Sequence, residues 1–125
     1  GVQMLKQQIT VAAGSRVMVW VESGQIGAFS FGAYNPQLAI YIDSSSTSPS
    51  RGQSHRINKD NDHYWYPMSS ANSRVFLSAI GGKTISTAGT YYIYVYGGSY
   101  NGGTFIFNYQ GVTRGCSIIW AEVQG

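Results

Sequence analysis

The last third of the chain alternates runs of aromatic and β-branched residues with pairs of glycines. Residues 91–96 read YYIYVY, a glycine pair follows at 97–98, and a second run, FIFNY, begins soon after the glycine pair 102–103. Aromatic and β-branched side chains suit a pleated, half-buried surface, and glycine supplies the positive φ that tight turns need. The pattern predicts β-strands joined by glycine turns. Because its apolar residues fall on both strand faces, something must cover the second face.

The rest of the chain shows the same kind of pattern and predicts an all-β protein. Residues 23–36 are expected to form a short strand or a packed loop, and residues 43–73 are the least regular part. No window has a helical period, and short strands at this spacing are typical of a β-sandwich or barrel. The predicted strands are 8–11, 16–22, 38–42, 74–80, 83–86, 90–96, 104–109 and 115–123.

The size and charge of the chain narrow the class of protein. Its 125 residues have room for one domain with a hydrophobic core. Charged residues make up only 10%, so the surface must consist of small polar residues, glycine and tyrosine, as in many secreted β-proteins. The net charge of +3 comes from scattered residues, which excludes the basic patch of a nucleic-acid-binding protein. No apolar segment is long enough for membrane insertion.

The single cysteine and the N-terminus give two further expectations. Cys116 lies in an apolar run and has no second cysteine to pair with, so we expect a buried, inert thiol. The chain shows neither an initiating Met nor a signal peptide, so we expect it to be a piece of a longer protein.

Several segments resemble parts of a recurrent jelly-roll domain. A short strand, the turn Ala-Gly-Ser and residues 16–21 resemble its opening, and residues 37–43 resemble its next core strand. Residues 86–93, with Ala-Gly-Thr in the turn, and the closing strand 118–123 complete the pattern. This arrangement is similar to the trimeric tip domains of phage tail fibres and related bacterial fibre adhesins, which often share the tumour-necrosis-factor-like jelly roll.

The resemblance implies an antiparallel jelly-roll β-sandwich of eight to ten short strands. It implies a single domain over residues 1–125, the C-terminal fragment of a longer fibre protein. The expected assembly is a homotrimer at a surface-exposed, extracellular fibre tip. The expected partner is a cell-surface glycan or protein of a target bacterium.

The tyrosine-rich strand supplies a candidate oligomer interface. Tyr92, Tyr94 and Tyr96 share one face, and the residues between them share the other. One row can fill the core, and we expect the tyrosine row, together with Trp20, to meet neighbouring protomers, because apolar stripes mark interfaces. Alternatively, the tyrosines decorate a solvent-facing sheet with their hydroxyls outward.

Residues 55–66 hold the richest set of recognition side chains. Trp and Tyr offer flat faces for stacking on sugar rings, and Asp, Asn, His and Arg can bind hydroxyls, phosphate or carboxylate. The same aromatic residues can instead anchor a long loop onto the sandwich, and the sequence leaves both possibilities open. The predicted ligand-binding residues are His55, Arg56, Asp60, Asp62, His63, Tyr64, Trp65 and Tyr66, with Tyr100 and Asn101 at the tip of the hairpin 97–103.

One part of this segment partly matches a calcium-binding loop. Asn58, Asp60 and Asp62 have the required i, i+2, i+4 spacing. However, His63 stands where the loop needs glycine, and Ser69 stands where it needs a bidentate Glu, so the match fails. A looser calcium site or a histidine-ligated metal stays open, and we predict neither a metal nor a cofactor.

Nothing in the sequence assembles a catalytic site. Among the five acids only Asp60 and Asp62 are close together, and no pair has the arrangement that glycoside hydrolysis requires. No GxSxG, HExxH or phosphate-binding loop is present. We therefore expect a binding protein rather than an enzyme.

Two other functions fit the same sequence. The first is a monomeric carbohydrate-binding module cut from a larger secreted enzyme, with Trp65 and its neighbours as the binding platform. The second is a structural, capsid-like β-sandwich without a ligand. Oligomeric mass separates the fibre tip from the carbohydrate-binding module, and any saturable ligand counts against the structural protein.

Overall fold

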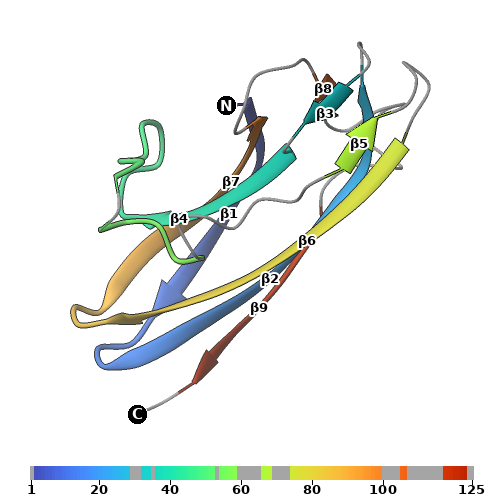
Figure 1. Ribbon diagram of the computed structural model, residues 1–125. Helices are drawn as coiled ribbons and strands as arrows, with labels where there is room; N and C mark the ends of the chain where they lie inside the picture. The colour runs from blue at the N-terminus through green and yellow to red at the C-terminus, as the bar shows by residue number, and fades with distance from the viewer. Residues whose placement is uncertain are drawn as a thin grey trace.

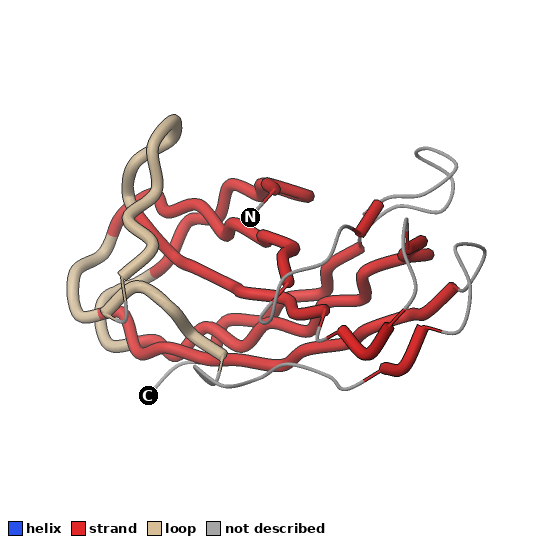
Figure 2. The backbone as a smooth tube through the Cα atoms, turned by 45° about the horizontal axis from the view of Figure 1, so that its top comes forward, coloured by secondary structure: helices blue, strands red, loops and turns tan. Residues whose placement is uncertain are grey.

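The computed structural model describes most of the chain and shows two layers of antiparallel strands packed face to face (Figures 1 and 2). Within the described part every regular element is a β-strand. The prediction of an all-β antiparallel sandwich is therefore confirmed. The described residues are 2–28, 32–34, 36–52, 54–58, 66–68, 74–99, 105–106 and 117–123.

Each layer is built around three strands. The first has the order β1 (Val2–Val11), β7 (Gly89–Ser99) and β4 (Pro36–Asp43). The second has the order β6 (Arg74–Ile85), β2 (Ser15–Ala28) and β9 (Ser117–Val123). The short β8 (Phe105–Ile106) pairs with the end of β2, and β3 (Gly32–Tyr34) pairs with β5 (Tyr66–Met68) in a separate sheet. The chain thus crosses between the two layers from β1 to β2 and from β6 to β7.

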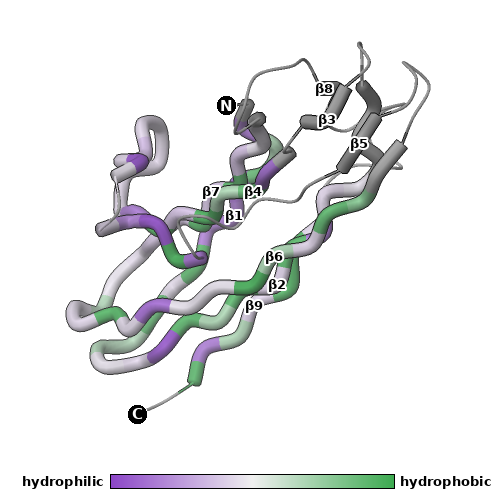
Figure 3. Tube along the Cα trace, in the orientation of Figure 1, coloured by the Kyte–Doolittle hydropathy of each residue, from purple (hydrophilic) through white to green (hydrophobic). Residues whose placement is uncertain are grey.

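The core lies between the layers because each strand turns alternate side chains inward. Figure 3 shows hydrophobic residues interspersed with hydrophilic ones along β2. Val17, Val19 and Val21 of this strand are buried, while Trp20 between them is exposed. The buried apolar residues of the core are Ile9, Val11, Val17, Val19, Val21, Leu38, Ile40, Ile42, Ile57, Leu77, Ala79, Ile85, Ile93 and Val95.

Several observed strands are longer than their predicted cores. β1 begins at Val2 rather than at residue 8, because its backbone pairs with β7 even where its side chains are polar. β2 continues past Glu22 through a bulge in which Gly24 has a φ of 72°. At this bulge the Ser23 hydroxyl accepts a hydrogen bond from the Leu77 N–H at 2.9 Å. That bond satisfies a buried donor where the ladder is interrupted.

The predicted break between strands 74–80 and 83–86 is wrong, because both belong to the single strand β6. Gly81 and Gly82 stay in the ladder and pair with β2. A β-carbon on Gly81 would lie 2.5 Å from the carbonyl oxygen of Ile57. This glycine therefore allows another backbone segment to come close, rather than making a turn.

The expected turn at Gly97 and Gly98 is also wrong. Gly97 pairs with Val2 on one side and Leu38 on the other, so β7 continues to Ser99. The turn predicted between the first two strands is confirmed, with Gly14 at a φ of 80°. Glycines in this chain therefore occupy positions within strands as well as turns.

Replacing Gly81 by alanine will destabilise the fold by about 1–3 kcal/mol, because the new methyl overlaps the Ile57 backbone. The matched control is Gly52→Ala, where nothing lies within 4 Å of the new methyl, and we expect a change within about 0.5 kcal/mol. Urea denaturation of both variants measures the difference. Equal stabilities would contradict the close approach at Gly81.

Candidate functional site

Two of the ten predicted ligand-binding residues have described side chains, His55 and Arg56. Both belong to residues 54–58, which we call the edge strap. Tyr66 lies in β5, where the structure describes its backbone only. The remaining predicted residues lie outside the described part: Asp60, Asp62, His63, Tyr64, Trp65, Tyr100 and Asn101.

The edge strap pairs with β4 along the side that β7 leaves open. The Ile42 N–H donates to the His55 carbonyl at 3.1 Å, and the Ile57 N–H donates to the Ile40 carbonyl at 2.9 Å. Between these bonds Arg56 forms an isolated antiparallel bridge with Tyr41. The side chains of His55 and Arg56 lie on opposite sides of the strap, because each lines a different hollow of the surface.

The side chain of Asn58 extends this pairing by one more residue of β4. Its amide oxygen accepts from the Ile40 N–H at 3.0 Å, and its amide nitrogen donates to the Leu38 carbonyl at 2.9 Å. Asn58 is itself buried, so these bonds satisfy polar groups that water does not reach. The strap is thus fixed to a rigid strand on either side of Ile57, whose side chain joins the core.

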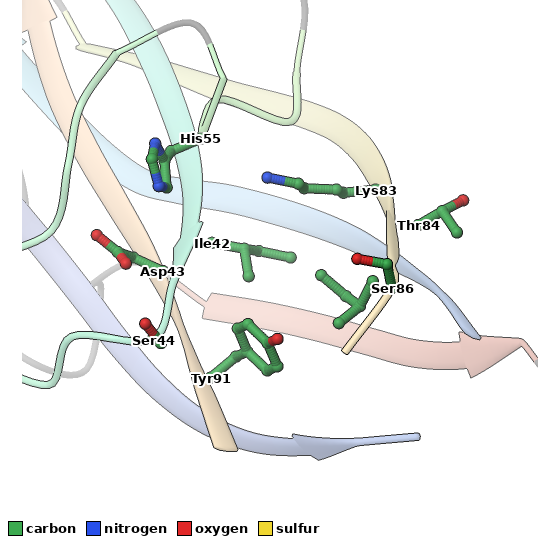
Figure 4. A pocket seen from close by; sticks show the side chains of 9 residues that line it. Ile42, Asp43, Ser44, His55, Lys83, Thr84, Ser86 and Tyr91 are labelled. Carbon is green, nitrogen blue, oxygen red and sulfur yellow. The ribbon is translucent and has the colours of Figure 1, made fainter. Parts of the chain in front are cut away.

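A cavity of about 180 Å³ lies on the His55 side of the strap, and we call it the His55 cavity. Figure 4 shows the His55 ring and the Lys83 side chain approaching it from the strap and from β6. Asp43 and Tyr91 lie on its other side. The cavity is lined by Ile42, Asp43, Ser44, His55, Lys83, Thr84, Ile85, Ser86 and Tyr91.

The charged groups of the cavity are held by short contacts with the backbone. The Lys83 ammonium donates to the Ser54 carbonyl at 2.7 Å. The Asp43 carboxylate accepts from the N–H groups of Ser50 at 2.6 Å and Ser45 at 3.3 Å. Burial raises the pKa of the Asp43 carboxyl, but these hydrogen bonds and the charge of His55 outweigh it, so the pKa is below its usual value. Asp43 is therefore an anion at neutral pH.

The cavity combines a carboxylate, an ammonium group, an imidazole and serine hydroxyls beside an aromatic ring. These groups can donate to and accept from the hydroxyls of a sugar, and the Tyr91 ring offers an apolar surface. Pockets for drug-sized ligands have volumes of roughly 300–1,000 Å³. The smaller volume here suits one ring or the end of a longer chain rather than a complete oligosaccharide.

The Arg56 side of the strap faces the outer surface of the first layer, where Tyr92, Tyr94 and Tyr96 also lie. Tyr94 is fully buried, and its hydroxyl donates to the Ser45 carbonyl at 2.5 Å. Burial raises the pKa of the Tyr94 phenol, and the charge of Asp43 raises it further. The segment after β4 thus already covers the middle of the tyrosine row.

The four residues predicted to form the oligomer interface do not form one patch. Trp20 is 41% exposed and points away from the core of the second layer, whereas the tyrosine row lies on the outer side of the first. The sandwich therefore separates them by its full thickness. That either surface meets a second protomer stays a prediction.

Sequence reasoning missed Asp43, Lys83, Ser86 and Tyr91 as members of a shared cavity. They come from the ends of three strands and the connection after β6, and local spacing carries no signal that joins them. The available hint was positional, since Asp43 directly follows the predicted strand 38–42. A charged residue at such a boundary often lies at the rim of a sandwich.

The described residues hold no group of three or more His, Cys, Asp or Glu side chains able to bind a metal ion. A search of the same described ranges for a helix long and apolar enough to cross a membrane finds none. Comparison with protein-family models, curated proteins and solved structures finds no match to this chain.

Proposed function

We propose that this chain is the receptor-binding tip domain of a trimeric, surface-exposed fibre, which recognises a cell-surface glycan without altering it. The observation that carries the proposal is the His55 cavity, which places donors, an acceptor and an aromatic ring at one end of a rigid sandwich. The low fraction of charged residues supports an extracellular location.

Two features support the finer part of the proposal, a jelly roll that associates as a trimer. The crossings from β1 to β2 and from β6 to β7 are of the kind that a jelly roll contains. On the outer face of the second layer, Trp20 pairs with Ile80 on one side and Ile119 on the other. Ile80 is 54% and Ile119 is 72% exposed. A row of large apolar side chains across three strands is typical of a surface that another protomer covers.

The trimer predicts a solution mass three times that of the 13.6 kDa chain, measured by light scattering after size exclusion. The double substitution Trp20→Ser and Ile119→Ser will shift the mass to one chain, because it removes the apolar row. Tyr92→Ser, on the opposite outer face, separates the two predicted interfaces: it will stay trimeric where the Trp20 row forms the trimer and will become monomeric where the tyrosine row does. A monomeric parent protein would reject the fibre tip and favour the carbohydrate-binding module.

Glycan recognition at the His55 cavity predicts saturable binding on a glycan array, weakened about tenfold or more by Lys83→Met. The matched control is Lys6→Met, since Lys6 also donates to a serine carbonyl, that of Ser46 at 2.9 Å, but lies away from the cavity. Equal effects of the two substitutions would place the ligand elsewhere. An array without any bound glycan would remove the proposed function.

A further inference from the structure

A second hollow, of about 150 Å³, lies on the Arg56 side of the edge strap, and we call it the Arg51 hollow. Its floor is formed by small residues of neighbouring strands, because Ala39 of β4 and the glycines of β7 leave space above the sheet. It is lined by Gln37, Ala39, Tyr41, Arg51, Arg56, Tyr96, Gly97 and Gly98. Gly97 and Gly98, which lie within β7 rather than in a turn, thus leave the space that forms the hollow.

The guanidinium of Arg51 lies on the ring of Tyr96, with 4.6 Å between the guanidinium carbon and the ring centroid. The ring is itself held in place. It packs edge-on against Tyr41 at 5.8 Å, and its hydroxyl donates to the Gln3 side chain at 3.3 Å. Arg51 therefore rests on a fixed aromatic platform. A guanidinium held in this way loses less freedom when it binds a ligand than one on an unsupported side chain.

Arg56 brings a second positive charge to the hollow. Its Nε–H donates to the Asn58 amide oxygen at 3.0 Å, and a terminal nitrogen donates to the Leu38 carbonyl at 3.4 Å. These bonds fix the position of the guanidinium beside the hollow.

The described lining of the hollow contains the guanidinium groups of Arg51 and Arg56. Guanidinium groups match the oxygen geometry of carboxylate and phosphate. The Gln37 amide and the phenol groups can bind hydroxyls next to such an anion. The His55 cavity differs, because it contains the Asp43 carboxylate, which repels an anion.

We infer that the Arg51 hollow binds the carboxylate or phosphate group of an acidic sugar, with Arg51 as the principal contact. The inference rests on the proposed function in taking the ligand to be a glycan. It extends that function, because the protein would bind a neutral sugar ring in the His55 cavity and an acidic sugar ring in the Arg51 hollow, on the two sides of the edge strap.

The test uses three probes that share one sugar frame: glucuronate, glucose 6-phosphate and glucose. Titration of each into isotope-labelled protein is followed by NMR at the amides of Gly97 and Gly98 and at the Arg51 Nε–H. We expect saturable shifts with at least one anionic probe and none with glucose. Whether glucuronate or glucose 6-phosphate binds more tightly identifies the anionic group.

Arg51→Gln will weaken binding of the anionic probe roughly tenfold or more, because it removes a charge-assisted contact. The control is Lys6→Gln, since Lys6 lies over the ring of Tyr92, 5.7 Å from its centroid, and is a similar cation on an aromatic ring outside the hollow. Equal weakening by both variants, or equal binding of glucose, would overturn the inference.

The two proposals fail separately. Glycan binding that depends on Lys83 but not on Arg51 would overturn the hollow as an anion site and leave the proposed function in place. Shifts of Arg51 with the anionic probes, together with an array on which no glycan binds, would support the hollow and remove the proposed function.

Discussion

The open edge of β4 presents backbone N–H and C=O groups that need partners, and the edge strap supplies them. Without the strap, Ile40 and Ile42 would leave donors or acceptors unpaired beside the core, and exposed strand edges also promote aggregation. The strap uses its own backbone for part of this pairing and the Asn58 side chain for the rest. It fits only because Gly81 of β6 lacks a side chain, since a β-carbon there would lie 2.5 Å from the carbonyl oxygen of Ile57.

Both candidate binding surfaces depend on this pairing. The strap, fixed against β4, holds His55 at one cavity and Arg56 at the other hollow. The other groups of each surface come from strands whose positions the sandwich core already determines. The pairing that closes the edge of β4 therefore also fixes the positions of these charged side chains. Recognition of small polar ligands requires side chains that are held in place in this way.

Local pattern predicted those parts of the molecule that depend on side-chain alternation. In β2 burial alternates with period two, and Val17, Val19 and Val21 are buried. In β7 Ile93 and Val95 lie in the core, but Tyr94 between them is buried as well, because the segment after β4 covers it. The glycine pairs of β6 and β7 were misread, because a glycine needed for close approach looks the same in sequence as one needed for a turn. Composition pointed to His55 and Arg56, whose role in binding stays a prediction. It did not point to Lys83, which lines the His55 cavity from β6, or to Arg51, which lies on the ring of Tyr96 in β7, because contacts between segments far apart in the sequence leave no local signal.

Hydrogen exchange at the strap tests this account most directly. If the strap closes the edge of β4, the amides of Ile40, Ile42 and Ile57 will exchange as slowly as those of β7 in the middle of the layer, since all three donate hydrogen bonds across the pairing. The reference for an open segment is the amides of Thr47 and Ser48, which donate only to the Ser45 hydroxyl on the exposed surface. Exchange of the three strap amides at the rate of this reference pair would contradict the account.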